Sequence, residues 1–236
     1  MVAELTVGPG SGSTTFYEGP VMTSVFAYAG RAVRMVRPSD PDRLLDDPGV
    51  LAWNRRDDYM PYWAYLWPGA FLLAEAVSRE PWREGGSALE IGCGLGLTGL
   101  VALARGLRVR FTDYDEAPLR FVTRSAAENG FDPTTFSTVR LDWRNPPEAR
   151  YPIILGADVL YERRLVPLVA DLLAAMLEPG GLALIADPYR AAAEGFPRAL
   201  ADRDLSCEVE PIAAETGELG SLRGTLHRVR AGESPR

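Results

Sequence analysis

A glycine-rich turn between two apolar segments constrains the fold of this chain more than any other feature of its sequence. Residues 88–100 read "ALEIGCGLGLTGL", so an apolar run meets three closely spaced glycines and then resumes with helical spacing. This pattern is typical of a buried strand, a tight turn and the start of a helix. Free backbone N–H groups and the positive end of the helix dipole gather at such a turn. We therefore expect a polar or anionic ligand there.

The segments that follow this turn alternate between strands and helices. The strand segments are nearly continuous apolar runs, which is typical of a parallel sheet covered by helices on both faces. Strands are expected at 87–92, 107–113, 136–142, 151–158, 182–188, 204–212 and 223–230, and helices at 97–106, 117–130 and 163–177. The sequence thus predicts an α/β fold with a doubly wound, mostly parallel sheet, closed by a final pair of strands.

The N-terminal part of the chain differs in composition. Its first twenty residues are rich in Gly, Ser and Thr and are expected to form a mobile tail. Residues 22–38 alternate enough for one or two strands, residues 39–60 are expected to be a connection, and a helix is expected to begin near Pro68. We predict that residues 1–60 are a tail and extension and that residues 61–236 form the main domain.

Composition excludes several kinds of chemistry. Cys93 and Cys207 are the two cysteines and His227 is the single histidine, so no disulfide framework, cysteine-based zinc cluster or histidine-rich metal site is predicted. His227 lies in an alternating stretch and is expected on the surface of a strand. A formal net charge of −7 argues against broad contact with nucleic acid. The sequence shows neither a membrane span nor a signal peptide, which makes the cytoplasm the expected location.

Acidic residues at three strand ends discriminate between possible ligands. Asp113 alone would suit the ribose of NAD equally well, and the turn formally contains the G-x-G-x-x-G dinucleotide pattern. Glu90, however, lies beside the glycine turn, where a carboxylate would oppose a pyrophosphate but would suit an ammonium group. Asp142, with Trp143 behind it, suits an adenine amino group and its ring face. These residues favour a ligand that carries ribose, adenine and an ammonium group.

The same stretches resemble a known family. "LEIGCGLGLTGL", "FTDYD", "LDW" and "GADVLY" resemble the successive motifs of class I, seven-stranded S-adenosylmethionine-dependent methyltransferases. "LDW" with "DVLY" is similar to the branch called methyltransferase family 16. "DDYMPYWAYLWPGAFLLAEAV" and "ADPYR" also resemble the lysine methyltransferases that act on the electron transfer flavoprotein β-subunit. The resemblance covers the chain from about residue 34 onwards and implies a Rossmann-like, seven-stranded methyltransferase fold with an N-terminal extension.

The resemblance implies roles for ten residues. The methionine portion of S-adenosylmethionine is expected to lie against Glu90, Gly92, Gly94 and Gly96. Its ribose hydroxyls are expected to bind Asp113, and its adenine is expected to lie against Asp142 and Trp143. Trp67 is expected to pack against the cofactor from the N-terminal side. Asp158 and Tyr161 are expected to face the acceptor amine as the catalytic pair. Asp115 remains an alternative for the ribose, and Asp158 has an alternative role as the cap of the helix that follows it.

The resemblance also implies a function. It predicts an S-adenosylmethionine-dependent N-methyltransferase that modifies lysine side chains of a protein, with the electron transfer flavoprotein β-subunit as the candidate partner. Neither nucleic acid nor a membrane is an expected partner. Two alternatives stay open: methyl transfer to a small-molecule amine or hydroxyl, and cofactor binding without catalysis.

Overall fold

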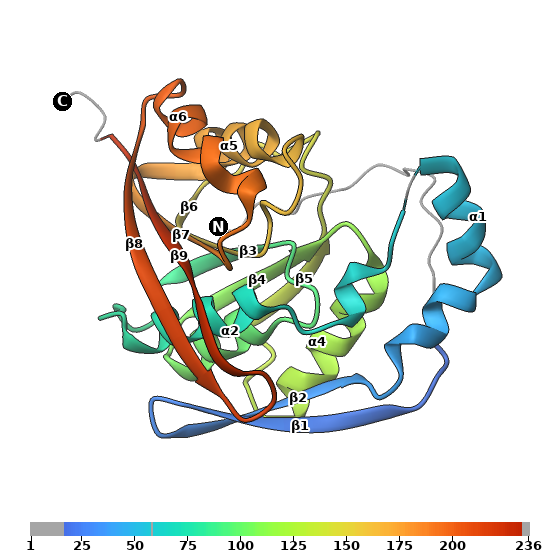
Figure 1. Cartoon of the computed structure of the whole chain (residues 1–236). Helices are drawn as coiled ribbons and strands as arrows, with labels where there is room; N and C mark the ends of the chain where they lie inside the picture. The colour runs from blue at the N-terminus through green and yellow to red at the C-terminus, as the bar shows by residue number, and fades with distance from the viewer. Residues whose placement is uncertain (1–16, 58, 233–236) are drawn as a thin grey trace.

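A seven-stranded mixed sheet forms the centre of the protein in the computed structural model, which describes residues 17–57 and 59–232 (Figure 1). Its strands are β3 (Ser87–Ile91), β4 (Arg108–Asp113), β5 (Phe136–Arg140), β6 (Tyr151–Ala157), β7 (Leu177–Asp187), β8 (Leu205–Thr216) and β9 (Gly220–Ala231). They lie in the order β5-β4-β3-β6-β7-β9-β8. The first five strands are parallel, and β9 pairs antiparallel with both of its neighbours, β7 and β8. The predicted doubly wound fold is confirmed.

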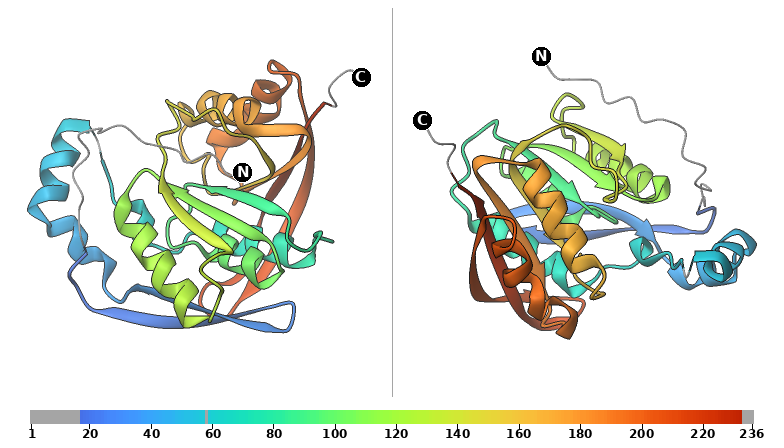
Figure 2. Two further views of the ribbon diagram at one scale, coloured as in Figure 1. Left: turned by 180° about the vertical axis from the view of Figure 1, so that it is seen from behind. Right: turned by 90° about the horizontal axis from the view of Figure 1, so that it is seen from above.

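Helices cover both faces of this sheet (Figure 2). One face carries α2 (Pro68–Arg79), α3 (Leu97–Ala104) and α4 (Glu116–Glu128), and the other carries α5 (Leu165–Met176) and α6 (Phe196–Ala201). Each side has its own apolar cluster, so the parallel strands are buried on both faces, as their apolar runs predict. Among the described residues, no helix combines the length and apolarity needed to cross a bilayer.

The path of the chain places a ligand site at one edge of the sheet. The units β3-α3-β4-α4-β5 build the sheet outwards in one direction, and β6-α5-β7 build it in the other. The strand order therefore reverses between the neighbours β3 and β6. In open parallel sheets, ligands bind beyond the carboxyl ends of the strands at such a switch point.

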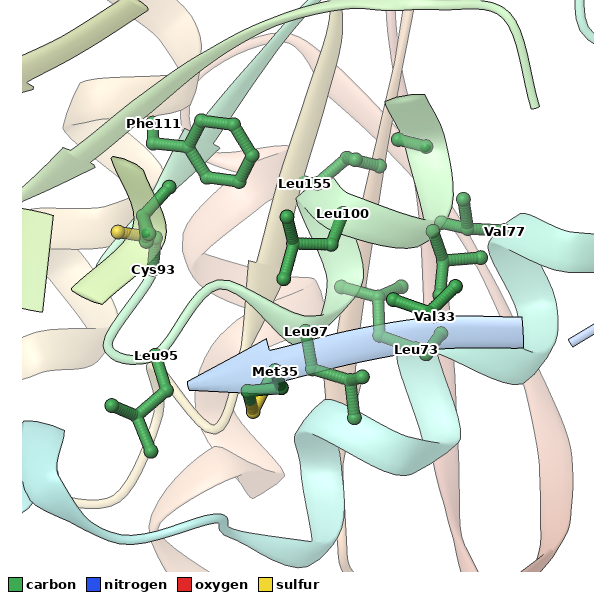
Figure 3. Close-up of a cluster of buried hydrophobic side chains, with 14 of the residues drawn as sticks. Val33, Met35, Leu73, Val77, Cys93, Leu95, Leu97, Leu100, Phe111 and Leu155 are labelled. Carbon is green, nitrogen blue, oxygen red and sulfur yellow. The ribbon is translucent and has the colours of Figure 1, made fainter. Parts of the chain in front are cut away.

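The N-terminal extension packs against the helices of one face. Strands β1 (Val21–Tyr28) and β2 (Arg31–Pro38) form an antiparallel hairpin that runs below α4 in Figure 1. Figure 3 shows Val33 and Met35 of β2 beside Leu97 of α3 and Leu73 of α2, within the same buried cluster. The Val36 N–H also donates to Ser125 Oγ of α4 at 2.9 Å. The extension is thus joined to the main sheet layer through α2, α3 and α4.

The expected connection over residues 39–60 contains helical structure. It holds the 3-10 helix η1 (Pro41–Asp46) and the helix α1 (Pro48–Asp57). The Asp47 side chain accepts the Val50 N–H at 3.0 Å, and Pro48 begins the helix, so "DPG" acts as a helix start. That signal is present in the sequence, whereas the weak apolar periodicity of the segment concealed the helix.

Several other elements differ from the sequence-based expectation. The aromatic segment before α2 forms the 3-10 helix η2 (Tyr62–Ala64). A second 3-10 helix, η3 (Ala191–Gly195), precedes α6, and the sequence predicted neither η3 nor α6. The hairpin β8-β9 is longer than the strands expected at 204–212 and 223–230, because β8 continues to Thr216 and β9 begins at Gly220. The expectation that His227 lies on the surface is wrong. It is 4% exposed beneath Phe196 of α6, and this burial lowers the pKa of its imidazole to about 4.

Candidate active site

All ten residues implied by the resemblance line one cavity. It has a volume of about 970 Å³ and lies at the carboxyl ends of β3, β4 and β6, on the switch point of the sheet. The ten are Trp67, Glu90, Gly92, Gly94, Gly96, Asp113, Asp142, Trp143, Asp158 and Tyr161. A pocket of this size accommodates a nucleoside-sized ligand together with part of a second substrate.

The glycine turn forms the floor of this cavity between β3 and α3. Gly92, Gly94 and Gly96 have φ angles of +57°, +49° and +78°, which side chains rarely adopt. A Cβ on Gly96 would also lie 2.6 Å from Val122 of α4, and one on Gly92 would lie 2.9 Å from Trp143. The turn therefore needs glycine for both conformation and space, and its bare backbone is open to a ligand, as the sequence predicts.

Asp113 braces this turn from the end of β4. Its two carboxylate oxygens accept the N–H groups of Gly94, at 2.8 Å, and of Asp115, at 3.1 Å. Its side chain is 8% exposed, and burial, reinforced by the charge of Asp115, raises its pKa to about 7. Each oxygen keeps a further lone pair, so Asp113 can brace the turn and accept a ligand hydroxyl as well.

Glu90 lies deeper, beneath the first turns of α3. It is 2% exposed, and its Oε2 accepts the Gly99 N–H at 3.1 Å. Burial raises the pKa of Glu90 to about 8, although the Gly99 N–H opposes this shift. A cationic group in the cavity would supply the missing compensation for the ionised carboxylate.

These raised pKa values predict how the stability of the ligand-free protein depends on pH. A carboxyl whose pKa is raised by folding binds more protons in the folded state than in the unfolded state. The stability that Glu90 contributes in this way is fully present below its unfolded pKa of about 4 and is lost as the pH rises through about 8. Glu90→Gln should reduce this loss by at least about 1 kcal/mol between about pH 5 and pH 8. Chemical denaturation at several pH values measures it, and parallel curves for wild type and variant would contradict it.

Aromatic and basic side chains surround the end of β5. Asp142 is paired with Arg144, which donates from Nε at 2.8 Å and from a terminal nitrogen at 2.6 Å, and these hydrogen bonds hold the pKa of Asp142 low. The guanidinium carbons of Arg140 and Arg144 lie 5.1 and 5.7 Å from the ring centre of Tyr114. Asp142 is therefore charged beside the predicted adenine position, with Arg144 as a partner that the sequence did not suggest.

Asp158 connects three segments on the other side of the cavity. It has a φ of +54° after β6 and is 7% exposed. One carboxylate oxygen accepts the Gly69 N–H in the first turn of α2 at 2.6 Å, and the other pairs with Arg190 Nε at 2.8 Å. The cap that Asp158 provides is thus on α2, not on the helix that follows it.

Three aromatic rings stand together beside this carboxylate. The Tyr62 ring centre lies 5.8 Å from that of Trp67 and 5.6 Å from that of Tyr161, and both contacts are edge-on. Trp67 Nε1 donates to the Tyr62 carbonyl at 2.8 Å. Tyr62 is the member that sequence analysis missed, although its position in the dense aromatic run "PYWAYLW" was a usable signal.

The N-terminal extension also reaches the cavity. The Tyr59 hydroxyl donates to Asp115 Oδ2 at 2.6 Å, and Tyr59 packs edge-on against Trp53 of α1. All three residues line the cavity. Asp115 is consequently engaged by the extension, while Asp113 is engaged by the glycine turn.

Comparison with known proteins identifies the family of this chain. A family model described as lysine methyltransferase matches residues 64–196. The electron transfer flavoprotein β-subunit lysine methyltransferase of Xenopus laevis is 29% identical over 140 residues, which is 58% of this chain and 56% of that protein. The protein N-lysine methyltransferase METTL21A of Xenopus tropicalis is 34% identical over 109 residues, or 44% and 50% of the two chains.

Solved structures support the fold. A methyltransferase of Methanosarcina mazei superposes with a TM-score of 0.53 at 12% identity, over 65% of this chain and 95% of that one. This chain spans about half the length of the curated relatives it matches. The family model covers more than half of the chain, including the glycine turn, the strand-end acids and "DVLY". The chain therefore belongs to the lysine methyltransferase family and has the class I methyltransferase fold.

Proposed function

We propose that this protein transfers a methyl group from S-adenosylmethionine to a lysine side chain of another protein. The observation that carries the proposal is the single cavity in which the glycine turn and the strand-end acids face the Asp158–Tyr161 side. One side of the cavity has the donors and acceptors suited to a nucleoside and an amino acid. The other has a carboxylate and aromatic faces suited to an alkyl amine.

The residues at the glycine turn fit the cofactor. Glu90 is a buried acid without a cationic partner in the described structure, which suits the cofactor's ammonium group. Asp113 has lone pairs left for ribose hydroxyls, and Asp142 and Trp143 offer an acceptor and a ring face to adenine. When bound, S-adenosylmethionine supplies an electrophilic methyl group on a sulfonium centre.

The acceptor side would align the amine and keep water away. Asp158 accepts an N–H of the amine and thereby directs the nitrogen lone pair into the cavity. The faces of Tyr62, Trp67 and Tyr161 enclose the aliphatic stem and the methylated cation. Burial raises the pKa of Tyr161 to about 12, so its hydroxyl stays neutral and acts as a hydrogen-bonding group.

The acceptor protein itself is proposed from one relative. The Xenopus laevis protein is named for the electron transfer flavoprotein β-subunit, and "WPG" and "DPYR" of this chain resemble segments of the lysine methyltransferases that act on that subunit. We propose the corresponding β-subunit from the same source as the first acceptor to test.

Labelling of a cell lysate tests the proposed function. Lysate incubated with methyl-labelled cofactor and this protein should show label in a protein band, and hydrolysis of that band should release methyllysine. The sequence contains no lysine, so methyllysine cannot come from the enzyme itself. Label confined to the small-molecule fraction would instead favour a small-molecule acceptor, and the absence of any transfer would contradict catalysis.

A further inference from the structure

We infer that Arg190 is a positioning residue that makes the site select the neutral form of the acceptor amine, acting through its ion pair with Asp158. The inference rests on the proposed lysine acceptor. Arg190 lies in the loop after β7, and it lines the cavity together with Asp158. From the sequence alone, Asp187 and Arg190 of "DPYR" are either substrate-side residues or a structural turn, and the pair with Asp158 becomes visible only in the folded chain.

Arg190 is held by two contacts of its guanidinium and one of its backbone. Its Nε donates to Asp158 Oδ1 at 2.8 Å, its backbone N–H donates to Asp187 Oδ1 at 2.7 Å, and its guanidinium carbon lies 5.7 Å from the Trp67 ring centre. The side chain of Asp158 is 6% exposed and that of Arg190 is 30% exposed. The charge of the buried carboxylate is therefore compensated within the protein before any substrate arrives.

This compensation matters because a lysine side chain is almost entirely protonated at neutral pH. With a pKa near 10.4, about one molecule in 2,500 is neutral at pH 7. An unpaired buried carboxylate would bind the ammonium form and raise its pKa further. A carboxylate paired with a guanidinium still accepts an N–H, but the pair has no net charge. The pair can therefore hold the neutral amine, whose proton has passed to bulk water, without stabilising the ammonium.

The other ionisable groups around the acceptor position fit this reading. Tyr161 is neutral, and Glu162 is paired with Arg164, which adds no net charge. Asp187 lies behind Arg190, with its pKa raised mainly by burial. The acids Glu90 and Asp113 lie on the cofactor side of the cavity, where they accept the N–H groups of Gly99 and Gly94. Of the described residues on the acceptor side, Asp158 is thus the carboxylate whose charge the amine meets.

The pH dependence of single-turnover methyl transfer tests the inference. With the electron transfer flavoprotein β-subunit, or the acceptor band found in lysate, the wild-type profile should give an apparent pKa at least about one unit below 10.4. Arg190→Gln should raise this apparent pKa, so that the rate falls at least about tenfold near pH 7 and recovers towards pH 10. Ethylguanidinium added to Arg190→Ala should restore the rate near pH 7.

A remote pair provides the matched control. Arg203 Nε donates to Asp171 Oδ1 at 2.7 Å, outside the cavity, and Arg203→Gln should leave the profile unchanged. Melting curves show whether each variant is folded, and the wild-type profile tests the inference even if the Arg190 variants do not fold. An active wild type with an apparent pKa near 10.4, or with a profile parallel to that of folded Arg190→Gln, would overturn the role of Arg190. An inactive wild type would contradict the proposed function itself.

Discussion

Asp158→Asn is expected to slow methyl transfer at least about tenfold, or roughly 1.4 kcal/mol in the barrier, with near-normal cofactor affinity. The amide keeps an oxygen that can accept the Gly69 N–H, so the start of α2 should remain in place. It removes the charge that pairs with Arg190 and weakens the acceptor for the amine. Single-turnover rates and cofactor dissociation constants separate the two effects.

The control for this prediction is Asp171→Asn, which alters an aspartate–arginine pair that lies away from the cavity and has an exposed carboxylate. That variant should transfer methyl groups at the wild-type rate. If Asp158→Asn does so too, Asp158 is a cap of α2 and the acceptor side needs another residue. Asp158→Ala is less informative, because removing one partner of a buried pair costs about 3 to 5 kcal/mol of stability.

The variants of Asp158 and Arg190 should also differ in their response to pH. Loss of the carboxylate acceptor should slow transfer at all pH values, whereas loss of the guanidinium should slow it mainly near neutral pH. Because the two side chains act as one pair, the double variant should be far from additive. An additive double variant would indicate that the two residues act independently, and would contradict the pair as the working unit.

Sequence reasoning located the site because its residues follow strand ends. Apolar runs identified β3, β4 and β6, and the carboxyl ends of parallel strands meet at one edge of a sheet. Residues such as Glu90 and Asp113 could therefore be placed together without any knowledge of side-chain contacts. The glycine turn was equally readable, because its φ values admit few other residues.

Sequence reasoning missed contacts between distant segments, because no shared periodicity in the sequence links those segments. Arg190 and Asp158 are 32 residues apart, and their pairing depends on the loop after β7, where Tyr189 has a φ of +60°. Tyr62 lies in a 3-10 helix, which has no apolar repeat to reveal which side faces the cavity. His227 was misjudged because nothing in its strand indicated that α6 would cover it.

Asp113→Ala is expected to weaken cofactor binding by about 1.5 to 3 kcal/mol without unfolding the chain. This variant loses two contacts of the Asp113 carboxylate: the predicted contact with the ribose hydroxyls, and the 2.8 Å hydrogen bond that the carboxylate accepts from the Gly94 N–H. Calorimetric titration with the demethylated cofactor measures the affinity. Melting of the ligand-free protein measures stability, and NAD should fail to raise the melting temperature of the wild type.

Asp115 provides the comparison that decides which acid serves the ribose. Both aspartates line the cavity, but Asp115 accepts the Tyr59 hydroxyl and has no contact with the glycine turn among the hydrogen bonds of the described residues. Asp115→Ala should therefore lose less affinity than Asp113→Ala. Asp113→Asn, which keeps one acceptor oxygen for Gly94, should fall between the wild type and Asp113→Ala. If Asp113→Ala binds the cofactor normally and Asp115→Ala does not, the ribose contact belongs to Asp115 and Asp113 serves only to hold the turn.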